Sequence, residues 1–337
     1  MKFGLLILAA LTLAGEPHRL VVHEWGTFST IAGEDGFALE WRPLAGTNDL
    51  PRFVHEIGDP SGLRHCVKCD LTAKIRMETP VLYFYTDRDM VVSVRVDFPK
   101  GKITEWYPNV RSVGSGIDWG RFAVLPNATT SLTTEAVANH YYAARETDSA
   151  LVRVCNTNGR APEFEKFLFY RGVGGFDLPV SVKLDGDFVR LAGLTDIEQV
   201  IVFENRGGNI GFRVVDVLAD EMTVERPPVG DSLALLLAEL QQSLVAHGLY
   251  KKEARAMLNT WRDSWFEEGL RVFYILPRKS TDAALPLTID PKPDELVRVL
   301  VGRIEVITPE MELRVLADPK LYGRFAEPIL KRASAHN

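Results

Sequence analysis

Residues 21–28, with the sequence VVHEWGTF, place a histidine and a carboxylate inside an otherwise apolar run. The β-branched and aromatic residues of this segment predict a strand. A buried charge is costly in free energy unless partners compensate it, so this strand needs partners from elsewhere in the chain. Because side chains alternate along a strand, we expect His23 and Glu24 on opposite faces, and Gly26 allows a local bulge.

Most of the segment 21–226 has the pattern of short strands separated by turns. Alternation of apolar and polar residues is clear at 91–98, and a turn at 99–102 leads into a further strand at 103–107. Similar pairs of strands occur at 180–184 with 188–191 and at 200–203 with 212–215. The pattern resembles a β-hairpin used two or three times, which is typical of an antiparallel β-sandwich.

The composition changes at residues 227–230, which read PPVG. Asp231 or Ser232 can cap a helix whose leucines recur at helical spacing up to Gly248, and a second helix is predicted over residues 251–268. The chain then returns to β structure. We therefore expect an α+β fold, with an antiparallel β-sandwich-like domain at 20–226. A helical hairpin and a C-terminal β segment at 227–337 would pack on it.

Residues 1–15 have the pattern of a signal peptide: Lys2, then an apolar run over 5–14, then Gly15. A buried N-terminal helix is the alternative. The run is too short to cross a bilayer, and no later segment approaches the roughly 20 apolar residues that a spanning helix needs. We expect a mature chain that is exported to the periplasm or the extracellular space, without an integral membrane span.

The chain contains three cysteines, Cys66, Cys69 and Cys155. In an oxidising compartment the Cys-x-x-Cys pair can form a short disulfide. Together with His65, the same pair could instead bind a soft metal, zinc or copper, although a strong zinc motif would contain two such pairs. Free or redox-active thiols are the third possibility. The role of Cys155 is open.

The predicted second helix ends with two acids, Glu267 and Glu268, where the helix macrodipole favours cations. Arg262 and Arg271 could simply neutralise them. The functional interpretation makes one of these acids a ligand or a general base at the start of the next strand. If that interpretation holds, His23 should meet Glu267 or Glu268 in one concave pocket.

A second functional pattern is a pair of carboxylates for glycosidic hydrolysis. Glu78 joins Glu24, Glu267 and Glu268 as an acid at the edge of an apolar element. Sugar rings could stack on aromatic residues that we expect to be exposed, namely Trp106, Tyr107 and Trp119. The same aromatic residues are equally common in cores.

Two common classes of function are excluded by the sequence. The net charge of −6 and the pI near 5.7 argue against binding of nucleic acid. Neither the HExxH motif of zinc proteases nor the Gly-x-Ser-x-Gly motif of serine hydrolases is present.

Three sequence segments resemble those of a known family: HEWGTF, METPVLYFY and TWRDSWFEEGLRVFYILPR. The chain resembles a family of uncharacterised exported bacterial proteins that share the HEWGTF and WFEEG motifs. The likeness covers about residues 22–315. It implies export and a single integrated architecture, and it supplies no reaction.

The leading hypothesis is an exported hydrolase, with or without a metal, that acts on a small molecule, a glycan or a peptide. Its catalytic residues would be His23, Glu24, Glu267, Glu268 and Arg271. A metal, zinc or copper, would be held by His23, His65, Cys66 and Cys69. The alternatives are a non-catalytic exported binding or structural protein, and a metal or thiol-redox role through His65-Cys66-x-x-Cys69.

Overall fold

The structure, a computed structural model, describes residues 19–46, 49–58, 66–155 and 161–335. The signal peptide predicted for residues 1–15 lies outside these ranges. The prediction of mixed helices and strands, with antiparallel sheets dominating, is confirmed. No helix in the described ranges is long and apolar enough to cross a membrane.

Nine strands of the described chain form a central sheet. In spatial order they are β14 (Asn209–Asp216), β13 (Gln199–Arg206), β16 (Gly269–Ile275), β18 (Glu295–Val306), β1 (Leu20–Ala32), β3 (Ile75–Thr86), β10 (Leu168–Gly174), β5 (Gly101–Tyr107) and β2 (His55–Glu56). β1 pairs in parallel with β18 and antiparallel with β3. The sheet therefore joins strands from both sides of the boundary expected at 226–227. Residues 298–306 of β18 are all buried, which suits a central strand.

Two smaller sheets complete the β structure of the described residues. One contains β17 (Leu287–Asp290), β4 (Met90–Asp97), β7 (Gly116–Leu125), β8 (Leu151–Val154) and β9 (Glu163–Glu165), with β6 (Ser112–Val113) paired to β7. The other contains β11 (Ser181–Asp185), β12 (Phe188–Ala192) and β15 (Glu221–Glu225).

Two of the three predicted hairpins are formed, β11 with β12 and β13 with β14. The hairpin predicted from 91–98 and 103–107 is wrong. β4 pairs with β7 and β17, whereas β5 pairs with β10 in the central sheet. β4 buries mainly alternate residues and β5 buries five in succession, so the two strands suit different layers.

The predicted helical hairpin is confirmed. The helices are α1 (Leu233–Ala246), α2 (Lys251–Trp265), α3 (Arg278–Ala284), α4 (Pro309–Ala317) and α5 (Ala326–Ala335), and short 3₁₀ turns are η1 (Val67–Asp70), η2 (His140–Arg145) and η3 (Gly323–Phe325). The side chain of Ser232 caps α1 by accepting a hydrogen bond from the backbone of Ala234. α2 ends three residues before the predicted limit of 268.

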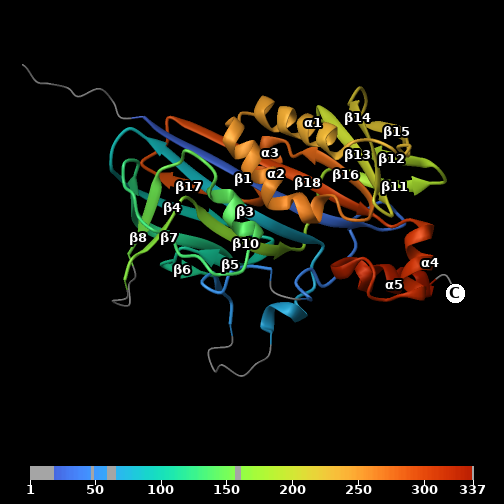
Figure 1. Cartoon of the computed structure of the whole chain (residues 1–337), viewed down its shortest axis with the longest axis horizontal. Helices are drawn as coiled ribbons and strands as arrows, with labels where there is room; N and C mark the ends of the chain where they lie inside the picture. Colours follow the sequence, from blue (N-terminus) through green and yellow to red (C-terminus); the bar gives the residue numbers. More distant parts are fainter. Residues whose placement is uncertain (1–18, 47–48, 59–65, 156–160, 336–337) are drawn as a thin grey trace, which may run out of the picture.

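The central sheet is covered on both faces. On one face, a core that includes Phe28 and Val94 joins it to the smaller sheets. On the other face, which we call the helix-side face, a core that includes Trp25, Leu240 and Trp261 joins it to α1 and α2. Figure 1 shows α1 and α2 lying across the sheet, with α4 and α5 close to the C-terminus.

Three neighbouring strands are irregular at about the same level of the sheet. The register shifts between Trp25 and Thr27 where β1 meets β3, and between Phe169 and Gly172 where β10 meets β3. Thr79 of β3 has a φ of 47°, a left-handed value that β-branched residues rarely adopt. Such bulges redirect side chains. The bulge considered at Gly26 is confirmed.

Replacing Gly26 by Ala is expected to lower the free energy of unfolding by about 1–3 kcal/mol. The added Cβ would lie 2.9 Å from Cα of Pro80 and 3.1 Å from its nitrogen, so backbone must move. Urea denaturation measures the change. Gly175→Ala is the control, because its Cβ would meet no described atom within 4 Å. Equal losses in both variants would rule out crowding at Pro80 as the cause.

Candidate functional site

His23 of β1 is fully buried, and its side chain contacts the first turn of α2. Its Nδ1 lies 2.8 Å from Oε2 of Glu253, and Oε1 of Glu253 accepts a hydrogen bond from the Tyr85 hydroxyl. The backbone N–H of Tyr250 donates to the same glutamate, and the Tyr250 ring lies 4.5 Å from the His23 ring between centroids. His23 therefore attaches α2 to the sheet.

Glu24 faces the opposite side of β1, as the alternation of the strand predicts. Its carboxylate accepts hydrogen bonds from Nε of Arg298 and from the hydroxyl of Tyr170. Arg298 also donates to Asp282 at 2.7 Å. The side chains of Glu24 and Arg298 are both inaccessible to solvent. This buried ion pair satisfies Glu24 and removes it from a shared site with His23.

The two acids after α2 lie in the turn that leads to β16, outside the helix. The prediction that they stand in the last turn of the helix is therefore wrong, because α2 ends at Trp265. Glu267 accepts hydrogen bonds from Arg303 at 3.0 Å and from Arg324 at 3.3 Å. Glu268 pairs with Arg314. Each acid is neutralised by arginine.

Arg271 fastens this same turn to the sheet. Its Nε lies 2.7 Å from Oε2 of Glu305, and its terminal nitrogens donate to the backbone carbonyls of Glu267 and Glu268. The five predicted catalytic residues therefore do not form one site. His23 pairs with Glu253 at the start of α2, whereas Glu267 and Glu268 pair with arginines beyond the end of the same helix.

Cys66 and Cys69 form a disulfide, one of the alternatives left open by the sequence. Neither sulfur is then a thiolate ligand for zinc or copper. His65 lies outside the described residues. Within the described ranges, no group of three or more His, Cys, Asp or Glu residues has the arrangement of a metal site. The predicted ligand set of His23, His65, Cys66 and Cys69 is therefore not assembled in them.

The aromatic residues proposed as a sugar platform are buried. Trp106, Tyr107 and Trp119 are at most 9% exposed. Trp106 and Trp119 lie in the core between the sheets, and Tyr107 lies in the helix-side core. The expectation of exposed stacking rings was wrong, because strands covered on both faces bury aromatic residues of either orientation.

A band of seven buried charges crosses the helix-side face of the central sheet beyond the end of α2. We call it the charged band: Arg271 of β16, Arg303 and Glu305 of β18, Arg76 and Glu78 of β3, Arg171 of β10 and Glu105 of β5. Ion pairs with each other and with flanking acids connect these residues. Charges buried in such number are stable only when they are paired.

Glu78 lies at the centre of the charged band and is fully buried. One of its oxygens is 3.8–4.0 Å from guanidinium nitrogens of Arg76, Arg303 and Arg324. Burial by itself would raise the pKa of Glu78, but the three arginines outweigh it and hold this pKa at about 2. The carboxylate therefore stays ionised and offsets the mutual repulsion of the three guanidinium groups.

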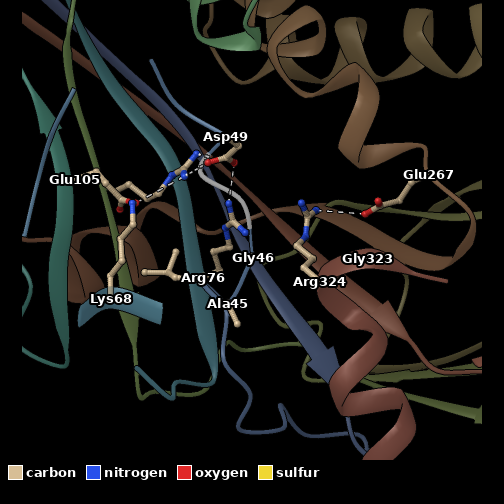
Figure 2. A pocket seen from close by; sticks show the side chains of 11 residues that line it. Ala45, Gly46, Asp49, Lys68, Arg76, Glu105, Glu267, Gly323 and Arg324 are labelled. Atoms are coloured by element: carbon tan, nitrogen blue, oxygen red, sulfur yellow. Dashed lines mark hydrogen bonds and ion pairs between the residues drawn. The ribbon is translucent and has the colours of Figure 1, made fainter. Parts of the chain in front are cut away.

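A cavity of about 350 Å³ opens over the charged band. Its charged lining consists of four cations, Lys68, Arg76, Arg171 and Arg324, and three acids, Asp49, Glu105 and Glu267. Figure 2 shows Asp49 beside Arg76, with the Lys68–Glu105 pair on one side and the Arg324–Glu267 pair on the other. The cavity is thus lined by charged groups that come from distant parts of the chain.

Asp49 holds two of the arginines in position. It accepts two hydrogen bonds from Arg171, at 2.6 and 3.2 Å, and one from Arg76 at 2.9 Å. Burial opposes its ionisation, but Arg171 and Arg76 together hold the pKa of Asp49 far below its usual value. Asp49 is therefore a permanent anion that orients both guanidinium groups.

Most residues of this site were missed from the sequence. Arg76, Arg171, Arg303 and Glu305 each have apolar residues or glycine on both sides in the segments IRMETPVL, LFYRGVG and VGRIEV. The same signal drew attention to His23 and Glu24. Applied to every strand, it would have identified the members of the charged band, though not their convergence.

A scan against models of protein families finds no match to this chain, and a search of curated proteins finds none either.

Proposed function

We propose that this chain is an exported protein that binds a small anionic molecule, through a carboxylate or a phosphate group, in the cavity over the charged band. The observation that supports this best is the convergence of Arg76, Arg171 and Arg324 on one cavity. Its volume of about 350 Å³ lies within the range of small-molecule sites. Export is supported by the signal-peptide pattern and by the family resemblance.

The hydrogen-bonding capacity of the cavity favours an anion. Each of its three acids already has a cation partner: Asp49 has Arg171 at 2.6 Å, Glu105 has Lys68 at 2.7 Å, and Glu267 has Arg303 at 3.0 Å. A carboxylate only accepts hydrogen bonds, whereas each guanidinium has five N–H donors.

Donors remain after this pairing. The Nε atoms of Arg76 and Arg171 are buried and therefore closed to a ligand, and Nε of Arg76 lies 3.8 Å from Glu78. Arg324 makes its hydrogen bond to Glu267 through one terminal nitrogen and has a side chain 18% exposed. Arg324 therefore has donor capacity to spare beside the cavity, which suits the oxygens of a carboxylate or phosphate.

The arginines are also preorganised. The terminal nitrogens of Arg76 donate to the carbonyl of Pro43 at 3.0 Å and to Asp49. Arg171 is held by two hydrogen bonds to Asp49. A ligand would not have to order these long side chains, and their charges act in a partly desolvated environment, which strengthens the interaction.

Hydrolysis of an anionic substrate in the same cavity is the second candidate, because Asp49, Glu105 and Glu267 place three carboxylates around it. A carboxyl group that acts as a general acid at neutral pH needs a raised pKa. The pKa of Asp49 is lowered far below its usual value. Binding is therefore the better supported of the two functions.

Isothermal titration calorimetry of the purified mature chain with inorganic phosphate, sulfate and succinate tests the proposal. We expect at least one of these anions to bind with 1:1 stoichiometry. Arg324→Gln should weaken that binding about tenfold or more, because a charge-assisted hydrogen bond is lost. Release of product from a hydrolysable ester of the same anion would favour the second candidate.

Arg190→Gln is the matched control. Arg190 also pairs with an aspartate, Asp185. It lies on β12 in the three-stranded sheet and is not among the residues that line the cavity. This variant should bind the anion as the wild type does. The proposal fails if none of the three anions binds. It also fails if Arg324→Gln binds the anion as tightly as Arg190→Gln and the wild type do.

A further inference from the structure

We propose that the Cys66–Cys69 disulfide controls the anion affinity of the cavity by holding Lys68 against Glu105. The inference rests on the anion-binding function proposed above, and it adds control of that function by thiol–disulfide exchange. Lys68 lies in the four-residue turn η1, inside the loop that the disulfide closes, with Val67 between it and Cys66 and with Cys69 directly after it. A bond that a dithiol can reduce thus lies in the same turn as a cation of the cavity lining.

The disulfide closes the turn that carries Lys68. The Cα atoms of Cys66 and Cys69 are 5.3 Å apart, and the backbone N–H of Cys69 donates to the carbonyl of Cys66 at 2.9 Å. A single 3₁₀ turn has little stability of its own, because few hydrogen bonds offset the entropy of ordering it. The covalent link replaces that missing stability.

Within this turn, Lys68 is directed inward. Its side chain is 9% exposed, and its Nζ lies 2.7 Å from Oε1 of Glu105 and 2.6 Å from Oε2 of Glu56. Glu56 is itself half exposed, whereas the side chain of Glu105 is only 2% exposed. Lys68 is therefore the close partner of a buried acid in the cavity wall.

Withdrawal of Lys68 would change the charge that a ligand meets. With Lys68 in place, the lining has four cations and three acids, and without it the numbers are equal. Arg171 lies 4.0 Å from the same oxygen of Glu105 and would become its nearest cation. An arginine drawn to Glu105 donates less well to a ligand, so anion affinity should fall.

The disulfide is accessible to a reductant, because Cys66 is exposed and Cys69 is half-buried. In the step that we propose, a thiolate of a dithiol attacks one sulfur, forms a mixed disulfide and releases the other cysteine. The second thiol of the reductant then displaces the remaining cysteine. Two electrons and two protons pass to the protein, which gains two thiols, and the dithiol becomes a cyclic disulfide.

The test compares oxidised protein with protein reduced by dithiothreitol, using whichever of phosphate, sulfate and succinate binds the oxidised wild type most tightly. Calorimetry should show affinity about tenfold lower after reduction. The double variant Cys66→Ser/Cys69→Ser should bind as weakly without reductant. Lys68→Met, which keeps the disulfide, should bind weakly in the oxidised state and should not respond to dithiothreitol.

Cys155→Ser is the control for thiol chemistry elsewhere, since Cys155 is free and exposed, and it should respond as the wild type does. Circular dichroism and thermal unfolding check that each sample is folded. If the reduced protein unfolds, the anion affinity of the oxidised Lys68→Met variant is the deciding measurement. An affinity equal to that of the wild type would overturn the inference. If reduction leaves the anion affinity of the folded wild type unchanged, redox control is overturned and the proposed anion binding stands. If the oxidised wild type binds none of the anions, both proposals are overturned.

Discussion

Replacing Glu78 by Gln is expected to lower the free energy of unfolding at pH 7 by about 3–5 kcal/mol. The substitution removes the negative charge among Arg76, Arg303 and Arg324, whose nitrogens lie 3.8–4.0 Å from the carboxylate. Three guanidinium groups would then repel each other in a buried environment. Urea denaturation followed by circular dichroism measures the loss.

The same pair of proteins should show a defined pH dependence. The pKa of Glu78 is about 2 in the folded protein, against an ordinary value of 4.5. A carboxyl group whose pKa is lower in the folded protein than in the unfolded protein stabilises the fold. This stabilisation is fully present at a pH above the unfolded-state pKa, and it is lost as the pH falls through the folded-state pKa. The difference in the free energy of unfolding between wild type and Glu78→Gln should therefore shrink by about 3 kcal/mol as the pH falls from 4.5 to 2.

Glu327→Gln is the control for both measurements. Glu327 also pairs with an arginine, Arg42, but its side chain is 52% exposed. Surface ion pairs contribute about 0–1 kcal/mol, so this variant should be close to the wild type. If the difference between wild type and Glu78→Gln stayed constant down to pH 2, packing rather than charge would be the cause.

Replacing His23 by Ala is the second substitution with a large expected effect, a loss of about 3–5 kcal/mol in the free energy of unfolding. It leaves the buried carboxylate of Glu253 without its ring partner and opens space beneath Tyr250. A double-mutant cycle with Glu253→Gln should give a coupling energy of about 1–3 kcal/mol.

Lys252→Ala is the matched control in the same turn of α2. Lys252 makes a surface pair with Asp148, and both side chains are more than half exposed. We expect a change of less than about 1 kcal/mol. Additive effects of His23→Ala and Glu253→Gln, within about 0.5 kcal/mol, would contradict the view that this pair attaches α2 to the sheet.

Elements set by local patterns were predicted well. The strand that contains His23 and Glu24 is present, the two residues face opposite sides, and both helices of the hairpin are formed. Periodicity and capping residues report on neighbours along the chain, so these features can be read locally. The end of α2 was misplaced by three residues, so Glu267 and Glu268 were assigned to the helix and not to the turn that follows it.

Pairings between distant segments were not predicted. The sequence suggested Glu267 or Glu268 as the partner of His23, and the folded chain supplies Glu253 from the other end of the same helix. Strand alternation says which side chains share a face, but it does not say which strands are neighbours. The placement of β18 between β16 and β1 is such a case.

By itself, the sequence determined that polar side chains stand inside apolar strands, because that pattern depends only on the order of residues. It also placed two cysteines close enough to form a disulfide around Lys68. Only the tertiary structure decided that Arg76, Arg171 and Arg324 line one cavity, with Glu78 among the guanidinium groups of the charged band. The pairing of β3 with β10 brings Arg76 and Arg171 together, and the turn η3 adds Arg324, so the convergence depends on contacts between segments that are far apart in the chain.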